Sequence, residues 1–199
     1  RDVLEMRRET RYDDLDLAPE FPTPLAPRHL RLGVTERLLA DGSVRVPIDE
    51  ANVRRVVAEL RSAGVETLAV CLLHAAVNPA HEMVVARIAA EAFDPELVSS
   101  SSQVQPEIRE YERMCTTAAN AYVQPRVRRY VGRLKEGIAA RGYQAPLYIM
   151  QSNGGFAGPE ESSRFPVRLI ESGPAAGAIA AADYGKDSGI NDLISFDMG

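Results

Sequence analysis

A short apolar run, residues 65–73, limits the possible folds of this chain more than any other feature. It is nearly continuous in apolar residues and bounded on both sides, which is typical of a strand buried on both faces of a sheet. Residues 50–63 before it repeat apolar side chains at the i, i+3, i+4, i+7 spacing of a helix, and residues 79–92 after it form a second helical segment. Helix, buried strand and helix in this order predict a parallel α/β layer.

The ends of these elements carry recognisable signals. Asp49 is placed to cap the first helix and Gly64 to end it, while Pro79 suits the first turn of the second helix. His74, His81 and Glu82 lie between the strand and the second helix, but their spacing is not that of a zinc motif. We therefore expect Asn78 and Glu82 to cap the second helix, with the histidines hydrogen-bonded locally.

The remaining segments complete an α/β pattern. Closely spaced prolines predict an extended connector over residues 1–27, and Asp-Gly at 41–42 predicts a β-hairpin within 30–48. Residues 106–140 look helical, with a break or kink at Pro125. Further short strands are expected at 97–100, 147–150 and 166–170. Charged side chains near the start of the long helix, at Glu110, Glu112 and Arg113, predict ion pairs on a solvated face or, alternatively, a domain interface.

Two stretches near the end of the chain suit an anion or a metal–nucleotide. Residues 151–155 form a polar, glycine-rich turn directly after a strand, where backbone amides can face an anion, although many such sequences are only turns. A helix follows Gly173 and Pro174, and a strand at 193–196 then brings Asp197 and Gly199 to its carboxyl end. A carboxylate followed by glycine suits magnesium and phosphate at that position.

Composition narrows the class of protein. Of 199 residues, 45% are hydrophobic and 26% charged, which is ordinary for a globular chain. The net charge of −5 disfavours a nucleic-acid partner, and no apolar run is long enough for a membrane span. Cys71 and Cys115 are expected to be buried thiols in a cytoplasmic protein rather than a disulfide. Because the chain starts at Arg1 and stops within the motif at Gly199, we expect it to be part of a longer protein.

Five motifs, in order and with matching separations, carry a resemblance to a known family. They are Leu72-Leu-His-Ala-Ala-Val-Asn-Pro-Ala-His-Glu82, Arg109-Glu-Tyr-Glu-Arg113 with Asn120-Ala-Tyr122, Met150-Gln-Ser-Asn-Gly-Gly155, Ser172-Gly-Pro-Ala-Ala-Gly177 and Phe196-Asp-Met-Gly199. Over essentially its whole length the chain resembles the hydantoinase A / 5-oxoprolinase family, which also includes subunits of ATP-dependent ketone carboxylases.

The resemblance implies an actin-like ATPase fold built from ribonuclease-H-like domains, with ATP between two of them. Residues 28–170 would belong to the N-terminal-type domain, and residues 171–199 would be a connecting helix and the start of the second domain. The resemblance also implies a site that binds ATP and magnesium. Asp197 would be catalytic and hold magnesium, and the phosphates would lie against Gly199, Ser172, Gly173, Ser152, Asn153, Gly154 and Gly155.

The implied reaction is ATP-dependent opening of a cyclic amide or imide, in which phosphorylation activates the ring carbonyl. A hydantoinase B-type subunit or domain would be the partner, in an oligomer without nucleic acid or membrane. One alternative is the ATP-handling subunit of an acetone- or acetophenone-type carboxylase, and another is a non-catalytic actin-like scaffold. A Rossmann dinucleotide-binding protein is disfavoured because no G-x-G-x-x-G follows a predicted strand. Residues 1–199 alone are expected to be inactive, because half the nucleotide cleft would be absent.

Overall fold

The computed structural model describes residues 1–8, 18 and 20–198. These form two compact units, Arg1–Tyr122 and Val123–Gly199. The boundary falls inside α5 (Glu110–Ala140), a helix of 31 residues that runs through Pro125 without ending there. Of the two predicted outcomes at Pro125, a break into two helices is wrong, because the long helical segments on either side tolerate the loss of one N–H donor. A kink within a single helix stays a prediction. The predicted domain division at residue 171 stays a prediction.

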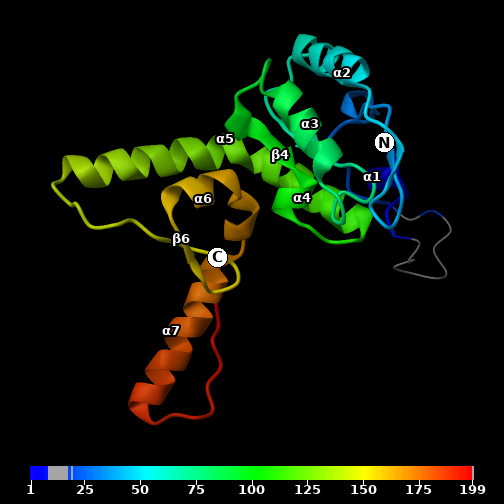
Figure 1. The fold of residues 1–199 in the computed structure, drawn as a ribbon. Coiled ribbons are helices and arrows are strands. Elements are labelled where there is room, and N and C mark those ends of the chain that lie inside the picture. The colour runs from blue at the N-terminus through cyan, green and yellow to red at the C-terminus, as the bar shows by residue number, and fades with distance from the viewer. Residues whose placement is uncertain (9–17, 19, 199) are drawn as a thin grey trace. The chain divides into compact units, whose positions relative to one another are not determined.

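The first unit contains a βαβ arrangement (Figure 1). Its elements are α1 (Val3–Met6), η1 (Arg28–Leu30), β1 (Arg37–Leu38), β2 (Val44–Val46), α2 (Glu50–Ser62), β3 (Leu68–Val70), α3 (Ala80–Ala89), η2 (Pro95–Leu97), β4 (Val98–Ser100), α4 (Ser101–Val104) and the start of α5. Strands β3 and β4 pair in parallel, with Leu68 opposite Val98, and α3 lies in the connection between them. The predicted parallel α/β layer is confirmed.

Helices pack on both faces of the β3–β4 sheet, although Ala69 of β3 stays exposed. On one face, Leu68 and Val70 pack in a core formed with α2, α3 and Phe93. On the other face, the side-chain Nδ2 of Asn120 in α5 donates a hydrogen bond of 3.0 Å to Ser99 Oγ. Ser99 is paired with the small residue Ala69, so α5 approaches the sheet over small side chains. Leu68 and Val70 are buried but Ala69 is exposed, so the predicted burial of this strand on both faces holds for one face only.

Several local signals act as the sequence predicts. Asp49 accepts a hydrogen bond of 3.0 Å from the Asn52 backbone amide and so caps α2. Gly64 follows the end of α2 with a φ of +78°, a conformation that favours glycine. Strands β1 and β2 form an antiparallel hairpin around Gly42, whose φ is +83°. These predictions are confirmed, although the hairpin strands are shorter than the predicted segment.

The predicted connector, residues 1–27, is not extended throughout. It contains the short helix α1, in which Leu4 is buried. The buried Arg31 side chain anchors this helix, because its guanidinium pairs with Glu5 and donates to the Arg1 carbonyl. An apolar contact and an ion pair with a distant residue thus stabilise a helix that local sequence does not reveal.

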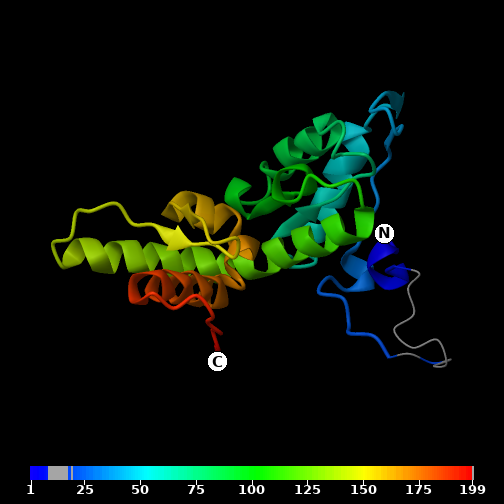
Figure 2. The same ribbon diagram turned by 90° about the horizontal axis from the view of Figure 1, so that it is seen from below.

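The second unit contains β5 (Ile149–Met150), β6 (Phe156–Ala157), α6 (Pro159–Arg164), η3 (Pro166–Leu169) and α7 (Ser172–Ser188), in addition to the end of α5. Strands β5 and β6 form an antiparallel hairpin, with β6 near α6 in Figure 2. Helix α7 ends at Gly189, whose φ is +71°. The strand predicted at 166–170 is wrong, since Pro166 instead begins a 3₁₀ helix.

The strand predicted at 193–196 is also absent from the described residues. Residues 190–198 run back along α7, as Figures 1 and 2 both show, and the Ile190 amide donates to the Gly185 carbonyl at 2.8 Å. Ile194 and Phe196 are 93% and 83% exposed. A buried strand needs neighbouring strands to satisfy its backbone groups, and the described part of the chain supplies none here.

Candidate functional site

The turn between β5 and β6, residues 151–155, satisfies most of its own backbone amides. The Gln151 amide donates to the Gly155 carbonyl at 2.8 Å, and the Gly154 amide donates to the Gln151 carbonyl at 3.0 Å. The Gly155 amide donates to Asn153 Oδ1 at 2.9 Å. Gly154 has a φ of +83°. Because these three amides donate within the turn, they are not available to phosphate, and a contact of the turn with phosphate would come from the remaining groups, such as the exposed Asn153.

Ser152 joins this turn to the beginning of α7. Its amide and its hydroxyl both donate to the Arg168 carbonyl, each at 2.7 Å, and its oxygen accepts from the Glu171 amide at 3.2 Å. Gly154 lies against the same helix, since a Cβ built on it would be 2.7 Å from Ile179 Cδ1. The structure therefore brings together two of the stretches that the sequence predicts to contact phosphate.

The first turn of α7 has the features of an anion site. Glu171 occupies the N-cap position without a side-chain hydrogen bond, and Ser172 and Gly173 are the first two helical residues. Ser172 is half-buried and Gly173 is exposed. The first amides of a helix lack acceptors within the helix, and the helix dipole favours negative charge at this end. A phosphate oxygen therefore fits here on geometric and electrostatic grounds.

Asp197 lies in the exposed segment after α7, and Gly199 lies outside the described residues. Within the residues that the structure describes, no hydrogen bond or ion pair joins Asp197 to the Ser152 turn or to the start of α7. The role of Asp197 as a magnesium ligand remains a prediction. Among the described residues, no three His, Cys, Asp or Glu side chains are grouped as a metal site would need.

Sequence reasoning missed the role of Glu82, which is fully buried. It was predicted to cap α3, but its Oε1 accepts from the Leu72 amide at 2.8 Å and from Ser101 Oγ at 2.6 Å. Its Oε2 accepts from the Ser102 amide at 2.8 Å, so it caps α4 instead. One signal was available: Glu82 shares a helix face with the buried Val85 and Ala89, where a carboxylate needs partners.

Arg113 also binds Leu72, through the Leu72 carbonyl, whereas Glu82 binds the Leu72 amide. Its Nη2 donates to the Leu72 carbonyl and its Nη1 to the Glu107 carbonyl, both at 2.7 Å, and only 1% of Arg113 is exposed. The prediction of a solvated ion pair is wrong for Arg113, because these carbonyls lie inside the unit. The prediction of an ion pair holds for Glu112, which pairs with Arg8 and Arg109. A hydrogen bond from its own backbone, together with these two arginines, lowers the pKa of the Glu112 carboxyl.

The neighbouring histidines differ from one another. His81 Nδ1 lies 2.8 Å from Glu36 Oε2, and both side chains are buried, so the predicted local hydrogen bond is wrong. His74 has a φ of +59°, which is uncommon for a residue with a side chain. Asn78 behaves as predicted, because its Oδ1 accepts from the Ala80 amide at 3.0 Å at the start of α3.

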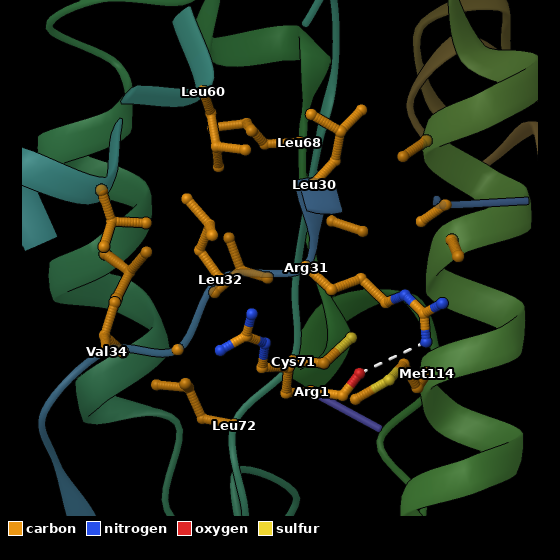
Figure 3. Close-up of a pocket in the computed structure, with 18 of the residues that line it drawn as sticks. Arg1, Leu30, Arg31, Leu32, Val34, Leu60, Leu68, Cys71, Leu72 and Met114 are labelled. Carbon is orange, nitrogen blue, oxygen red and sulfur yellow. Dashed lines mark hydrogen bonds between the residues drawn. The ribbon is translucent and has the colours of Figure 1, made fainter. Parts of the chain in front are cut away.

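A cavity of about 430 Å³ lies within the first unit (Figure 3). Its lining is mainly apolar and includes Leu30, Leu68 and Met114, together with the buried Arg31. Cys71 also borders it, and burial followed by the charge of Glu82 raises the pKa of that thiol to about 12. Both cysteines are free thiols, as predicted, but each is half-buried rather than buried. The cavity is lined by none of the predicted site residues, all of which belong to the second unit.

Comparison with protein-family models gives two matches that together cover most of the chain. Residues 1–93 match the hydantoinase/oxoprolinase N-terminal region, and residues 113–199 match hydantoinase/oxoprolinase. None of the helices in the described residues is long and apolar enough to cross a membrane. Both the models and the order of their matches agree with the resemblance seen in the sequence.

Three curated relatives extend this similarity. An uncharacterized protein of Methanocaldococcus jannaschii is 36% identical and the caprolactamase subunit alpha of Pseudomonas jessenii is 34% identical, each over the whole chain. The 5-oxoprolinase of Saccharomyces cerevisiae is 34% identical over 76% of the chain. The chain spans 29% of the length of the first two proteins and 12% of the third.

Two solved structures share the architecture. A crystal structure of ATP-dependent caprolactamase from Pseudomonas jessenii matches the whole chain with a TM-score of 0.78 and 32% identity, over 29% of its own length. A nucleotide-free acetone carboxylase structure matches 85% of the chain with a TM-score of 0.76 and 28% identity, over 24% of its own length. Family models, sequence relatives and solved structures agree, and the chain belongs to the hydantoinase/oxoprolinase family.

Proposed function

We propose that the protein containing this chain uses ATP to hydrolyse a cyclic amide or imide. The observation that carries this proposal is the similarity, over the whole chain, to a caprolactamase described as ATP-dependent, whose name gives a lactam as its substrate. The 5-oxoprolinase relative supports the same substrate class. In this proposal the complete protein has an actin-like ATPase fold and works with a hydantoinase B-type subunit, as the relative described as a subunit suggests.

The start of α7 supports a phosphate-binding role. Its first turn has no side-chain cap, and Gly173 leaves the approach to it open, since a Cβ there would meet nothing within 4 Å. The hydrogen bonds of Ser152 with Arg168 and Glu171 hold the β5–β6 turn beside this helix. When bound, ATP would supply the phosphoryl group that makes the amide carbonyl easier to attack. The residues of this chain would orient the phosphates and offset their charge.

Asp197 is the proposed magnesium ligand. It is exposed, and Ile194, Phe196 and Met198 around it are exposed as well. A carboxylate suits magnesium directly or through water. We propose that Asp197 and Gly199 complete the nucleotide site together with the start of α7.

Calorimetric titration of the full-length protein with magnesium-ATP tests this proposal. Asp197→Asn should weaken binding at least tenfold, which is about 1.4 kcal/mol, because it removes the charge that holds magnesium. Asp187→Asn, at an exposed position in the last turn of α7, is the matched control and should bind as the unchanged protein does. Folded protein that binds no ATP would contradict the proposal and favour the non-catalytic scaffold.

A ketone carboxylase is the second candidate, because the structure also matches acetone carboxylase with a TM-score of 0.76. The two functions separate in one assay on the full-length protein with its partner subunit. ATP hydrolysis stimulated by a lactam, hydantoin or oxoproline supports the cyclic-amide proposal. Hydrolysis stimulated only by a ketone with bicarbonate overturns it in favour of carboxylation.

A further inference from the structure

The part of α5 that lies in the second unit exposes arginine and tyrosine side chains on one face (Figure 1). The exposed residues are Arg126, Arg129, Tyr130 and Arg133, whereas Val131 on the opposite side of the helix is buried. Spacings of three, four and seven residues place these side chains on the same side of a helix. We call these four residues the arginine face.

The arginine face lacks the acidic side chains that usually separate basic ones on a solvated helix. Helix α2 has the usual arrangement, since Arg54 Nη2 lies 3.8 Å from Glu50 Oε2, four residues earlier. In α5, by contrast, residues 113–135 contain no Asp or Glu. Arg129 lies three residues from Arg126 and four from Arg133, and like charges at these spacings destabilise a helix. The sequence therefore concentrates positive charge here at a cost to the helix itself.

Two members of the arginine face have no partner of opposite charge. Arg126 and Arg133 form no hydrogen bond or ion pair with another residue that the structure describes. Lys135, which lies outside the arginine face, pairs with Glu160 of α6 at 2.9 Å. Residues 123–141 contain six Lys or Arg and one Glu, a net charge of +5, although the whole chain has a net charge of −5. A positive surface on an otherwise acidic chain is complementary to an acidic protein surface.

We propose that the arginine face binds an acidic surface of the partner subunit in the full-length enzyme. Arginine and tyrosine are the residue types that are enriched in the energetically important centres of protein interfaces. A guanidinium group donates several N–H groups to carboxylates, and the ring of Tyr130, which is 59% exposed, offers an apolar surface with a polar tip. A nucleic acid fits less well, because the net negative charge of the chain would repel its phosphates.

The inference rests on the proposed function for the existence of a partner subunit, and it adds the surface that this subunit would contact. Two relatives are described as subunits, the caprolactamase subunit alpha and the acetone carboxylase beta subunit. Binding between subunits is measured without ATP or substrate. Its result is therefore independent of whether the protein binds ATP or which substrate it uses.

Calorimetric titration of the full-length protein with its partner subunit tests the arginine face. We expect the double variant Arg126→Glu/Arg133→Glu to raise the Kd at least about tenfold, because it replaces attraction by repulsion. Binding by the unchanged protein should weaken between about 50 mM and about 300 mM salt, and the variant should lose most of this dependence. Arg45→Glu, at an exposed position of β2, is the matched control and should bind as the unchanged protein does.

A second variant guards against misfolding. Arg126→Gln/Arg133→Gln removes the charges without reversing them, and it should weaken binding less than the double reversal. Equal binding by the unchanged protein and by folded variants of both kinds overturns the inference and leaves the partner subunit in place. An equal loss in Arg45→Glu also overturns it, since the effect would then depend on net charge alone.

Two other results separate the inference from its alternatives. If even the unchanged protein does not bind the partner subunit, the inference fails together with the proposed partner, whereas ATP binding is still tested by its own titration. If the variants bind the partner subunit normally but lose binding to a single-stranded oligonucleotide, the arginine face binds nucleic acid and the inference is overturned.

Discussion

The buried carboxylate of Glu82 should contribute strongly to the free energy of unfolding. It accepts three hydrogen bonds of 2.6–2.8 Å, from the Leu72 amide, the Ser101 hydroxyl and the Ser102 amide. Glu82→Ala leaves all three donors without this acceptor. A buried unsatisfied polar group costs about 1–3 kcal/mol, and such losses are not additive. We therefore expect Glu82→Ala to lower the free energy of unfolding by about 3–5 kcal/mol.

Glu82→Gln separates the loss of a hydrogen bond from the loss of the side chain. An amide oxygen at the Oε1 position keeps the bonds from Leu72 and Ser101, while the amide nitrogen faces the Ser102 amide, which is also a donor. One lost hydrogen bond predicts a decrease of about 1–3 kcal/mol.

Urea denaturation of the full-length variants measures both effects. Glu59→Gln, at an exposed position on α2, is the matched control and should change stability by less than about 0.5 kcal/mol. The reasoning is refuted if Glu82→Ala unfolds at the same urea concentration as the control. It is also refuted if Glu82→Gln is as destabilised as Glu82→Ala.

Two further predictions concern Gly154 and Cys71. Gly154→Ala should lower the free energy of unfolding by about 1–2 kcal/mol, because the new Cβ takes a positive φ and lies 2.7 Å from Ile179 Cδ1. Thermal unfolding measures this loss. The control is Gly132→Ala, in α5, where the new Cβ has no atom within 4 Å and should stabilise the protein by about 0.5–1 kcal/mol. Equal effects at the two glycines would contradict the prediction. Cys71, with its pKa raised to about 12, should resist alkylation by iodoacetamide at pH 8. Rapid alkylation of the folded protein at pH 8 would contradict the raised pKa. In the unfolded chain the thiol ionises near pH 8.5, so the free energy of unfolding should fall as the pH rises from there toward 12.

Local sequence signals predicted the elements whose causes are local. The cap at Asp49, the turns at Gly42 and Gly64, and the apolar stripe of α2 act within a few residues. The errors have non-local causes. Glu82 is ten residues from Leu72 and nineteen from Ser101, so no short window shows what it binds. The failed strand at 193–196 shows the same limit, because a strand depends on neighbouring strands that can lie anywhere in the chain.

The candidate site was predicted only in part. The family resemblance suggested that the Ser152 turn and the start of α7 serve one site, and the hydrogen bond from the Glu171 amide to Ser152 Oγ joins them. The sequence could not show that the turn uses its own amides, because that depends on its exact backbone conformation. The contact of Gly154 with Ile179 likewise depends on tertiary packing.

The hydrogen bonds of Glu82 also bear on how the first unit unfolds. Helix α4 has only four residues, too few to be stable by itself, and its cap comes from α3 rather than from its own sequence. The same carboxylate holds the backbone just after β3. When the first turn of α3 opens, α4 loses its cap and the end of β3 loses its anchor at the same moment. These three segments should therefore open as one cooperative unit, so that their amides share a single opening free energy.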